Sequence, residues 1–124
     1  EDCGNVINPM VVEGQILGGI AQGVGQALYE HGIYDEDGQL VTGSMLDYTM
    51  PRADNFPMIE SDRIETPSPS NSLGVKGVGE MGSITSPPAV VNAVVDALSD
   101  YGVKHIDMPL TSEKIWNLIK TNGG

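Results

Sequence analysis

The chain has 124 residues, enough for one ordinary domain and too few for two. Its 17 Asp and Glu residues against 6 Lys and Arg residues give a formal net charge of −11, which argues against nucleic-acid binding and against docking on anionic lipid. A single cysteine, Cys3, excludes an internal disulfide and favours the reducing cytoplasm. No apolar run approaches the roughly 20 residues that span a bilayer, and no signal peptide is visible. Because the chain does not begin with Met, we expect it to be a piece of something larger.

A first helix is predicted from about Met10 to Glu30, after a turn at residues 5–9, and Gly32 is placed to end it. Apolar residues recur along it at steps of four: Val12, Ile16, Ile20, Val24 and Leu28. Glycines interrupt the same stretch, and each costs about 1 kcal/mol relative to alanine, so packing has to stabilise this helix. A face without side chains permits close approach either by another part of the fold or by a rigid ligand, and Gln15 lies beside that face.

The middle of the chain predicts short extended elements. Residues 33–42 suggest a β-hairpin with its turn at Asp37-Gly38, residues 44–51 a further extended stretch, and residues 58–66 an exposed strand. A long irregular segment is expected from Pro67 to Pro88.

Two more helices are predicted in the last third. Ser86 is the expected N-cap of the first, ahead of two prolines, and Gly102 its expected end. A short strand is expected at residues 103–108, and a last helix from a cap at Thr111. The chain therefore predicts an α+β fold of mixed helices and short strands in a single domain, residues 1–124.

One glycine-rich segment, GVKGVGEMG at residues 74–82, is a candidate functional segment. It contains a GxGxxG spacing, but the Rossmann interpretation needs a strand before the motif and a helix opening after it, whereas a Pro/Ser-rich loop precedes it and SITSPP at residues 83–88 follows it. The ending of a Walker A loop is also missing. What remains is Glu80, which is either merely solvated or held by the glycines in a cleft, where it could serve as a general base. Lys76 either binds an anion or faces solvent. No histidine or cysteine has the spacing of a metal site, and Asp35-Glu36-Asp37 is either a solvated turn or a weak cation site.

Taken together, these segments resemble the C-terminal part of the molybdopterin-binding large subunit of the xanthine dehydrogenase/aldehyde oxidase/carbon monoxide dehydrogenase family. The resemblance covers about residues 1–120. It is carried by DCGNVINPMVVEGQILGGIAQGVGQALYE, by TGSMLDYTMPRADNFP and by TPSPSNSLGVKGVGEMGSITSPPAVVNAVVDAL, in that order.

The resemblance implies specific roles. The glutamate of the family's GVGE-type motif lies beside the metal and acts as a base, and its position here is Glu80. The glutamine of the GQ pair contacts the pterin, and its position is Gln15. Gly79, Gly82 and Lys76 belong to the loop that shapes the cofactor pocket. The cofactor implied is molybdenum with molybdopterin cytosine dinucleotide, and FAD and [2Fe–2S] clusters would lie on partner subunits.

The chain is much shorter than the family's large subunit and lacks its upstream glycine-rich segments. We therefore expect part of a molybdenum-dependent oxidoreductase that supplies the catalytic glutamate and part of the cofactor surface. Alone it would be inactive, and it would need the remainder of the large subunit. The alternative is a non-catalytic assembly or binding module that keeps the fold without the chemistry. The substrate, whether carbon monoxide, an aldehyde, a purine or a heterocycle, is left open.

Overall fold

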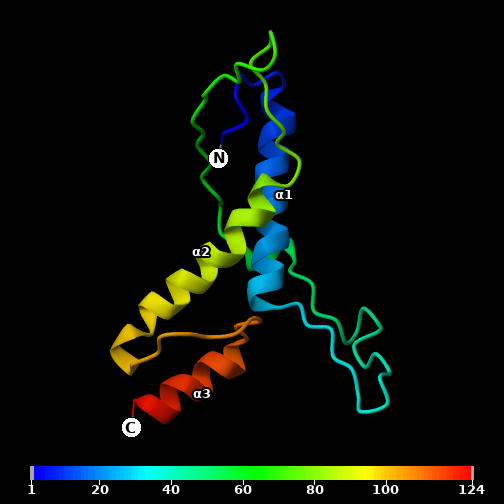
Figure 1. The fold of residues 1–124 in the computed structure, drawn as a ribbon. Coiled ribbons are helices and arrows are strands. Elements are labelled where there is room, and N and C mark those ends of the chain that lie inside the picture. Colours follow the sequence, from blue (N-terminus) through cyan, green and yellow to red (C-terminus); the bar gives the residue numbers. More distant parts are fainter. Residues whose placement is uncertain (1, 124) are drawn as a thin grey trace.

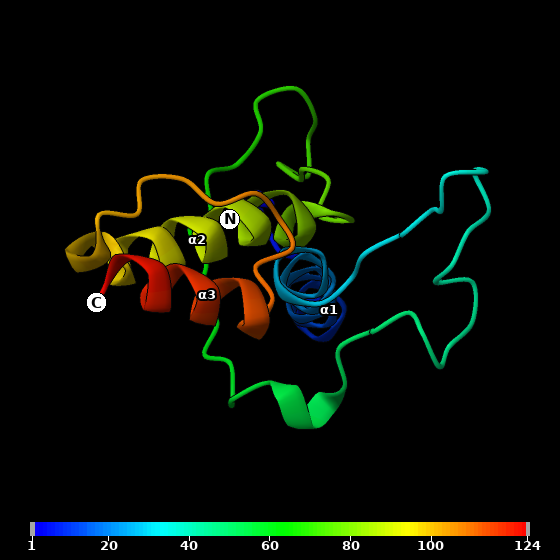
Figure 2. The ribbon, with the colours of Figure 1, turned by 90° about the horizontal axis from the view of Figure 1, so that it is seen from below.

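The computed structural model describes residues 2–123, which are mainly helical (Figure 1). In chain order the elements are α1 (Pro9–Leu28), the 3-10 turn η1 (Ala53–Asn55), α2 (Met81–Ala97), the 3-10 turn η2 (Ser99–Tyr101) and α3 (Ser112–Asn122). Helix α2 crosses α1 and extends away from it, and α3 lies beside α2 in both views (Figures 1 and 2). No helix within residues 2–123 is both long and apolar enough to cross a membrane.

The helices of the predicted α+β fold are confirmed, but its strands are not. Within residues 2–123 the extended pairing consists of two isolated antiparallel bridges, Gly4–Val75 and Tyr34–Leu40. The predicted hairpin at residues 33–42 forms in a minimal version, with its turn at Gly38, which has a φ of +79°, and the bridge between Tyr34 and Leu40. The Asp35 N–H donates to the Gln39 carbonyl at 3.0 Å and the Val41 N–H to the Ile33 carbonyl at 2.8 Å. No strand forms at residues 44–51, 58–66 or 103–108. A strand needs a neighbour to satisfy its backbone donors and acceptors, and the described residues give these three segments none.

Helix α1 begins at Pro9 and agrees with the predicted range of residues 10–30 to within two residues at each end. The Asn8 side chain accepts a hydrogen bond from the Val11 N–H at 3.2 Å, which caps the helix, and Pro9 occupies the first helical position. The predicted end at Gly32 is wrong. Helix α1 ends at Leu28, and the next two backbone N–H groups, those of residues 29 and 30, both donate to the Gly25 carbonyl.

The start of α2 corrects a second prediction. The helix begins at Met81, so Ser86 is an interior residue and not the N-cap, and the irregular segment ends before residue 81. The Ser86 hydroxyl donates to the Gly82 carbonyl at 2.7 Å, one turn earlier. Pro87 and Pro88 also lie inside the helix, where proline normally costs a hydrogen bond. Pro87 is buried against Gly23 of α1, and this packing offsets part of that cost.

The end of α2 and the start of α3 follow the sequence more closely. Gly102, expected to end α2, instead ends η2 with a φ of +70°, because one 3-10 turn follows the helix. Thr111 is the N-cap of α3 as predicted, and its hydroxyl accepts from the Lys114 N–H at 3.3 Å.

Within residues 2–123, two apolar clusters hold the elements together. The larger joins the end of α1 to α2, α3 and the segment between them; its buried members are Ala27, Leu98, Val103, Ile106 and Leu110. The smaller lies at the start of α1. Its buried members are Cys3, Val12 and Ile16, and Val78 and Met81 pack against them. This second cluster brings the start of the chain, α1 and the glycine-rich segment together.

Candidate functional site

Glu80 is the residue immediately before α2, where its carboxylate is exposed. Its side chain does not cap the helix, whereas its carbonyl accepts from the Ser83 hydroxyl at 2.9 Å and from the Ile84 N–H at 3.3 Å. Residues 2–123 therefore fix the backbone of Glu80 and leave its carboxylate open to solvent, without enclosing it in a cleft.

The backbone on both sides of Glu80 is anchored. Two residues before it, Val78 packs against the smaller apolar cluster, together with Met81. Two residues after it, Gly82 is buried against α1: a methyl group added there would lie 2.5 Å from the Ile16 carbonyl oxygen. Only a glycine permits this approach, so Gly82 places the start of α2 directly on α1.

Gln15 lies on the α1 segment that the start of α2 touches. It is exposed, and it is adjacent to Ile16, whose carbonyl meets Gly82. Gln15 and Glu80 are therefore each within two residues of one backbone contact between α1 and α2. The structure thus brings together two of the residues that the sequence singled out, although they are far apart along the chain.

The glycines around this contact divide into two groups. Some are packed: Gly19 and Gly23 of α1 face Gly82, Ser86 and Pro87 of α2. Others are open, because a methyl group added to them would have no neighbour within 4 Å; these are Gly14, Gly18, Gly77 and Gly79. The interpretation of close packing is therefore confirmed for the first group, whereas the second group leaves backbone uncovered and the expected approach of a ligand stays a prediction. Of the two predicted cofactor-binding glycines, Gly82 is in the packed group and Gly79 in the open one.

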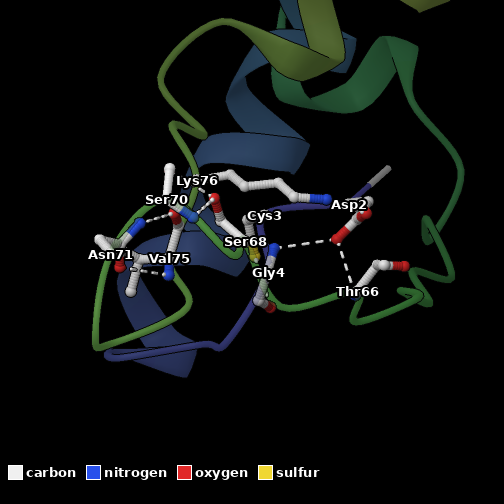
Figure 3. A network of polar contacts seen from close by, with 9 residues as sticks. All are labelled: Asp2, Cys3, Gly4, Thr66, Ser68, Ser70, Asn71, Val75 and Lys76. Carbon is white, nitrogen blue, oxygen red and sulfur yellow. Dashed lines mark hydrogen bonds and ion pairs between the residues drawn. The ribbon is translucent and has the colours of Figure 1, made fainter.

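Lys76 faces another residue of this chain. Its ammonium group lies 2.5 Å from Oδ2 of Asp2, and Oδ1 of Asp2 accepts from the Gly4 N–H at 2.9 Å and the Thr66 N–H at 3.0 Å (Figure 3). The Lys76 ammonium, followed by these backbone donors, holds the pKa of Asp2 well below its usual range. Asp2 is not among the site residues that the sequence predicts, and no spacing rule could have found it, because it lies 74 positions before Lys76.

A hollow of about 740 Å³ lies along α1, between Glu13 and Ile16 and the irregular segment at residues 59–65. Three acidic residues of that segment line it, Glu60, Asp62 and Glu65, together with Arg63. Neither Glu80 nor Gln15 is among its lining residues.

Comparison with known proteins places this arrangement in a family. Residues 1–57 match the model of the molybdopterin cofactor-binding domain. The chain is 52% identical over 115 residues to the nicotine 6-hydroxylase large subunit of Paenarthrobacter nicotinovorans, covering 93% of this chain and 14% of that protein. It is 42% identical over 120 residues to the carbon monoxide dehydrogenase large chain of Hydrogenophaga pseudoflava, covering 97% of this chain and 15% of that protein.

The fold gives the same result. The crystal structure of quinoline 2-oxidoreductase from Pseudomonas putida 86 superimposes with a TM-score of 0.92 at 50% identity, over 98% of this chain and 16% of that one. The chain thus belongs to the xanthine dehydrogenase/aldehyde oxidase/carbon monoxide dehydrogenase family, within its molybdopterin-binding large subunits, as the sequence resemblance predicted. It spans only about 14% of the length of the curated relatives that it matches.

Proposed function

We propose that this chain is a single-domain, C-terminal segment of the large subunit of a molybdenum-dependent oxidoreductase, in which Glu80 is the catalytic base. The homology to large subunits of such enzymes supports the class of reaction. The observation that carries the role of Glu80 is its placement: an exposed carboxylate held between two backbone anchors, Val78 and Gly82, beside the contact of α2 with α1.

The residues present fit a bulky, flat cofactor. The open glycines of α1 and of the glycine-rich loop expose backbone to a ligand without an intervening side chain. Gln15, exposed next to Gly14, offers an amide that both donates and accepts hydrogen bonds. We therefore assign Gln15 and Gly79 to direct contact with the pterin cofactor and Gly82 to the packing that shapes the pocket. Lys76 is retained as a pocket residue, with its ammonium held by Asp2.

In the proposed mechanism the bound molybdenum cofactor supplies the oxidising centre. Glu80 accepts a proton at a carboxylate oxygen as the substrate reacts. Its fixed backbone limits how far the carboxylate can stray from the reacting group, which is the positional requirement on a general base. Gln15 orients the cofactor from the α1 side, and the packed contact between Gly19 and Gly82 keeps α1 and the start of α2 at a constant separation.

The finer features of the complete enzyme are part of the same proposal. The cofactor would be molybdopterin cytosine dinucleotide, and FAD and [2Fe–2S] clusters on partner subunits would carry the electrons away. The remainder of the large subunit would enclose Glu80, whose carboxylate residues 2–123 leave exposed. We therefore expect the isolated chain to be inactive.

The test of Glu80 is its replacement in the complete enzyme. Glu80→Gln keeps the shape and removes the proton acceptor, so turnover should fall roughly 100- to 10,000-fold while molybdenum content stays unchanged. Glu113→Gln is the matched control, because Glu113 is also exposed and lies in the first turn of a helix, α3. Near-normal turnover of the Glu80 variant would remove Glu80 from the mechanism.

Native mass spectrometry tests the need for the rest of the subunit. The purified chain is measured before and after addition of the separately produced remainder. Capture of a molybdopterin dinucleotide only in the reconstituted complex supports a partial active site. If the chain binds neither the remainder of the subunit nor the cofactor, the result favours the alternative, a non-catalytic assembly module.

A further inference from the structure

The start of the chain is tied to the glycine-rich loop through backbone hydrogen bonds. The Lys76 N–H donates to the Cys3 carbonyl at 2.8 Å, and the Asn5 N–H donates to the Gly74 carbonyl at 3.0 Å. These bonds flank the antiparallel bridge between Gly4 and Val75. Cys3 is itself buried in the smaller apolar cluster, so the loop is held against a packed part of the molecule.

The carboxylate of Asp2 adds hydrogen bonds and an ion pair at the same place. Oδ1 accepts from the N–H groups of Gly4 and Thr66, and Oδ2 pairs with the Lys76 ammonium (Figure 3). Thr66 and Lys76 are the two ends of an irregular segment that leaves this point and returns to it. An isolated exposed ion pair contributes little, but here one charged group satisfies donors from three places along the chain.

The segment between these two ends is braced internally as well. The Asn71 side chain accepts from the Val75 N–H at 3.1 Å and donates to the Val75 carbonyl at 3.0 Å. The Ser68 N–H donates to the Gly74 carbonyl at 3.0 Å, and the hydroxyls of Ser68 and Ser70 share a hydrogen bond of 2.7 Å. The whole stretch from residue 66 to 76 is therefore a fixed support and not a free loop.

Glu80 lies four residues beyond the end of this support. Residues 77–79, here called the glycine tether, join Lys76 to Glu80. A methyl group added to Gly77 or Gly79 would have no neighbour within 4 Å. Glycine backbone is conformationally permissive, so Gly77 and Gly79 do not fix the course of the tether by themselves. Its anchors do so instead: Lys76 at its base and Val78, which packs on the smaller apolar cluster. On its far side Glu80 is already fixed by the contact of Gly82 with α1.

We propose that Asp2 is a positioning residue for Glu80, and that it acts by holding Lys76 and Thr66 together at the base of the glycine tether. This proposal rests on the proposed role of Glu80 and adds a function for Asp2 and Lys76. Lys76 then serves the site through its pairing with Asp2 and not through direct contact with the cofactor.

A double-mutant cycle in the complete enzyme tests the proposal. The variants are Asp2→Asn, which keeps an acceptor for the two N–H groups and removes the ion pair, Lys76→Met, and both together. Each single change should raise amide hydrogen exchange in residues 66–80. It should also lower kcat about tenfold, because a small displacement of a reacting group slows the reaction, while KM and molybdenum content stay unchanged. The double variant should be no worse than either single one, because the two residues act as a pair. Lys76→Arg keeps the pairing and should restore both readouts.

The matched control removes another ion pair, from the residues just before Thr66. Arg63 pairs with Glu65 at 3.2 Å, and within the described residues its side chain is not hydrogen-bonded to the glycine-rich loop, so Arg63→Met should leave exchange and kcat unchanged. Unchanged exchange in residues 66–80 of Asp2→Asn would overturn the proposal. Loss of cofactor in Lys76→Met but not in Asp2→Asn would also overturn it, since Lys76 would then bind the cofactor directly.

The exchange readout separates this proposal from the one on Glu80. If Glu80→Gln retains turnover, the base assignment fails, whereas the cycle between Asp2 and Lys76 still reports whether the two residues hold the loop. If Glu80→Gln is inactive and the exchange at residues 66–80 does not respond to Asp2→Asn, only the positioning role fails.

Discussion

Gly19 of α1 and Gly82 of α2 meet backbone against backbone. A methyl group added to Gly19 would lie 2.9 Å from the Gly82 Cα, and one added to Gly82 would lie 2.8 Å from the Ile20 nitrogen. Neither helix can carry a side chain here without moving apart from the other. Because Glu80 is two residues from this contact and Gln15 is four residues from it on α1, the separation of the two helices sets the separation of both proposed functional residues.

Replacing Gly82 by alanine should therefore destabilise the complete large subunit by about 1–3 kcal/mol, the usual range for overpacking a buried site. The added methyl would meet backbone atoms, which cannot rotate out of the way. Thermal unfolding and hydrogen exchange of α1 and α2 measure the effect. Molybdenum content should fall with it, since α1 and the start of α2 both contribute to the proposed cofactor surface.

Gly18→Ala is the control for this prediction. Gly18 is on the same helix as Gly19, but a methyl group there has no neighbour within 4 Å. Alanine is favoured over glycine in a helix by about 1 kcal/mol, so Gly18→Ala should leave the fold intact or stabilise it. Equal destabilisation by Gly18→Ala and Gly82→Ala would show that the contact between the helices is not the cause.

The helices were predictable because their signals are local. Asn8 and Thr111 are side-chain caps, and the apolar spacing of α1 repeats every four residues. The start of α2 was not predictable in this way. Ser86 and the two prolines after it are typical of a helix N-terminus, but packing of Ser86 and Pro87 on Gly23 places them in the helix interior. That contact joins residues more than 60 positions apart, which no local pattern reports.

The candidate site, too, was predictable only where its signals are local in the sequence. Glu80 and Gln15 were found because the segments around them resemble family motifs, and their proximity through the Ile16–Gly82 contact emerged only from the fold. Asp2 was missed because its importance comes from the partners that the fold gives it, Thr66 and Lys76. The predicted strands failed for a related reason: alternation of residue types indicates an extended segment but supplies no partner to pair with it.

The low pKa of Asp2 predicts a pH dependence. Since the Lys76 ammonium and the backbone N–H groups favour the charged carboxylate, the folded pKa lies below the unfolded one. The stabilisation from Asp2 is therefore complete above the ordinary Asp pKa of about 4 and is lost as the pH falls below it. After correction for the intrinsic pH dependence of amide exchange, the protection of residues 66–80 against hydrogen exchange should fall at acidic pH in the native protein. In Asp2→Asn this acid-induced loss of protection should be smaller, because protection is already reduced at neutral pH. An equal loss in both would assign the acid effect to other carboxylates.

Gln15 should matter for cofactor retention more than for folding. Its side chain is exposed on α1, so Gln15→Ala removes no buried contact, and alanine is at least as good a helix former. If the amide binds the pterin cofactor, the variant enzyme should lose molybdenum and pterin during dialysis faster than the native enzyme, with an apo-protein unfolding temperature that is unchanged. Gln26→Ala is the matched control, since Gln26 is also an exposed glutamine of α1 but lies near its other end, beyond the contacts of Gly82 with Ile16 and Ile20. Two results would contradict the prediction: equal cofactor loss in the two variants, or a lower unfolding temperature with normal cofactor content in Gln15→Ala. Either would mean that the amide of Gln15 does not hold the cofactor and that the open glycines beside it act through backbone contact alone.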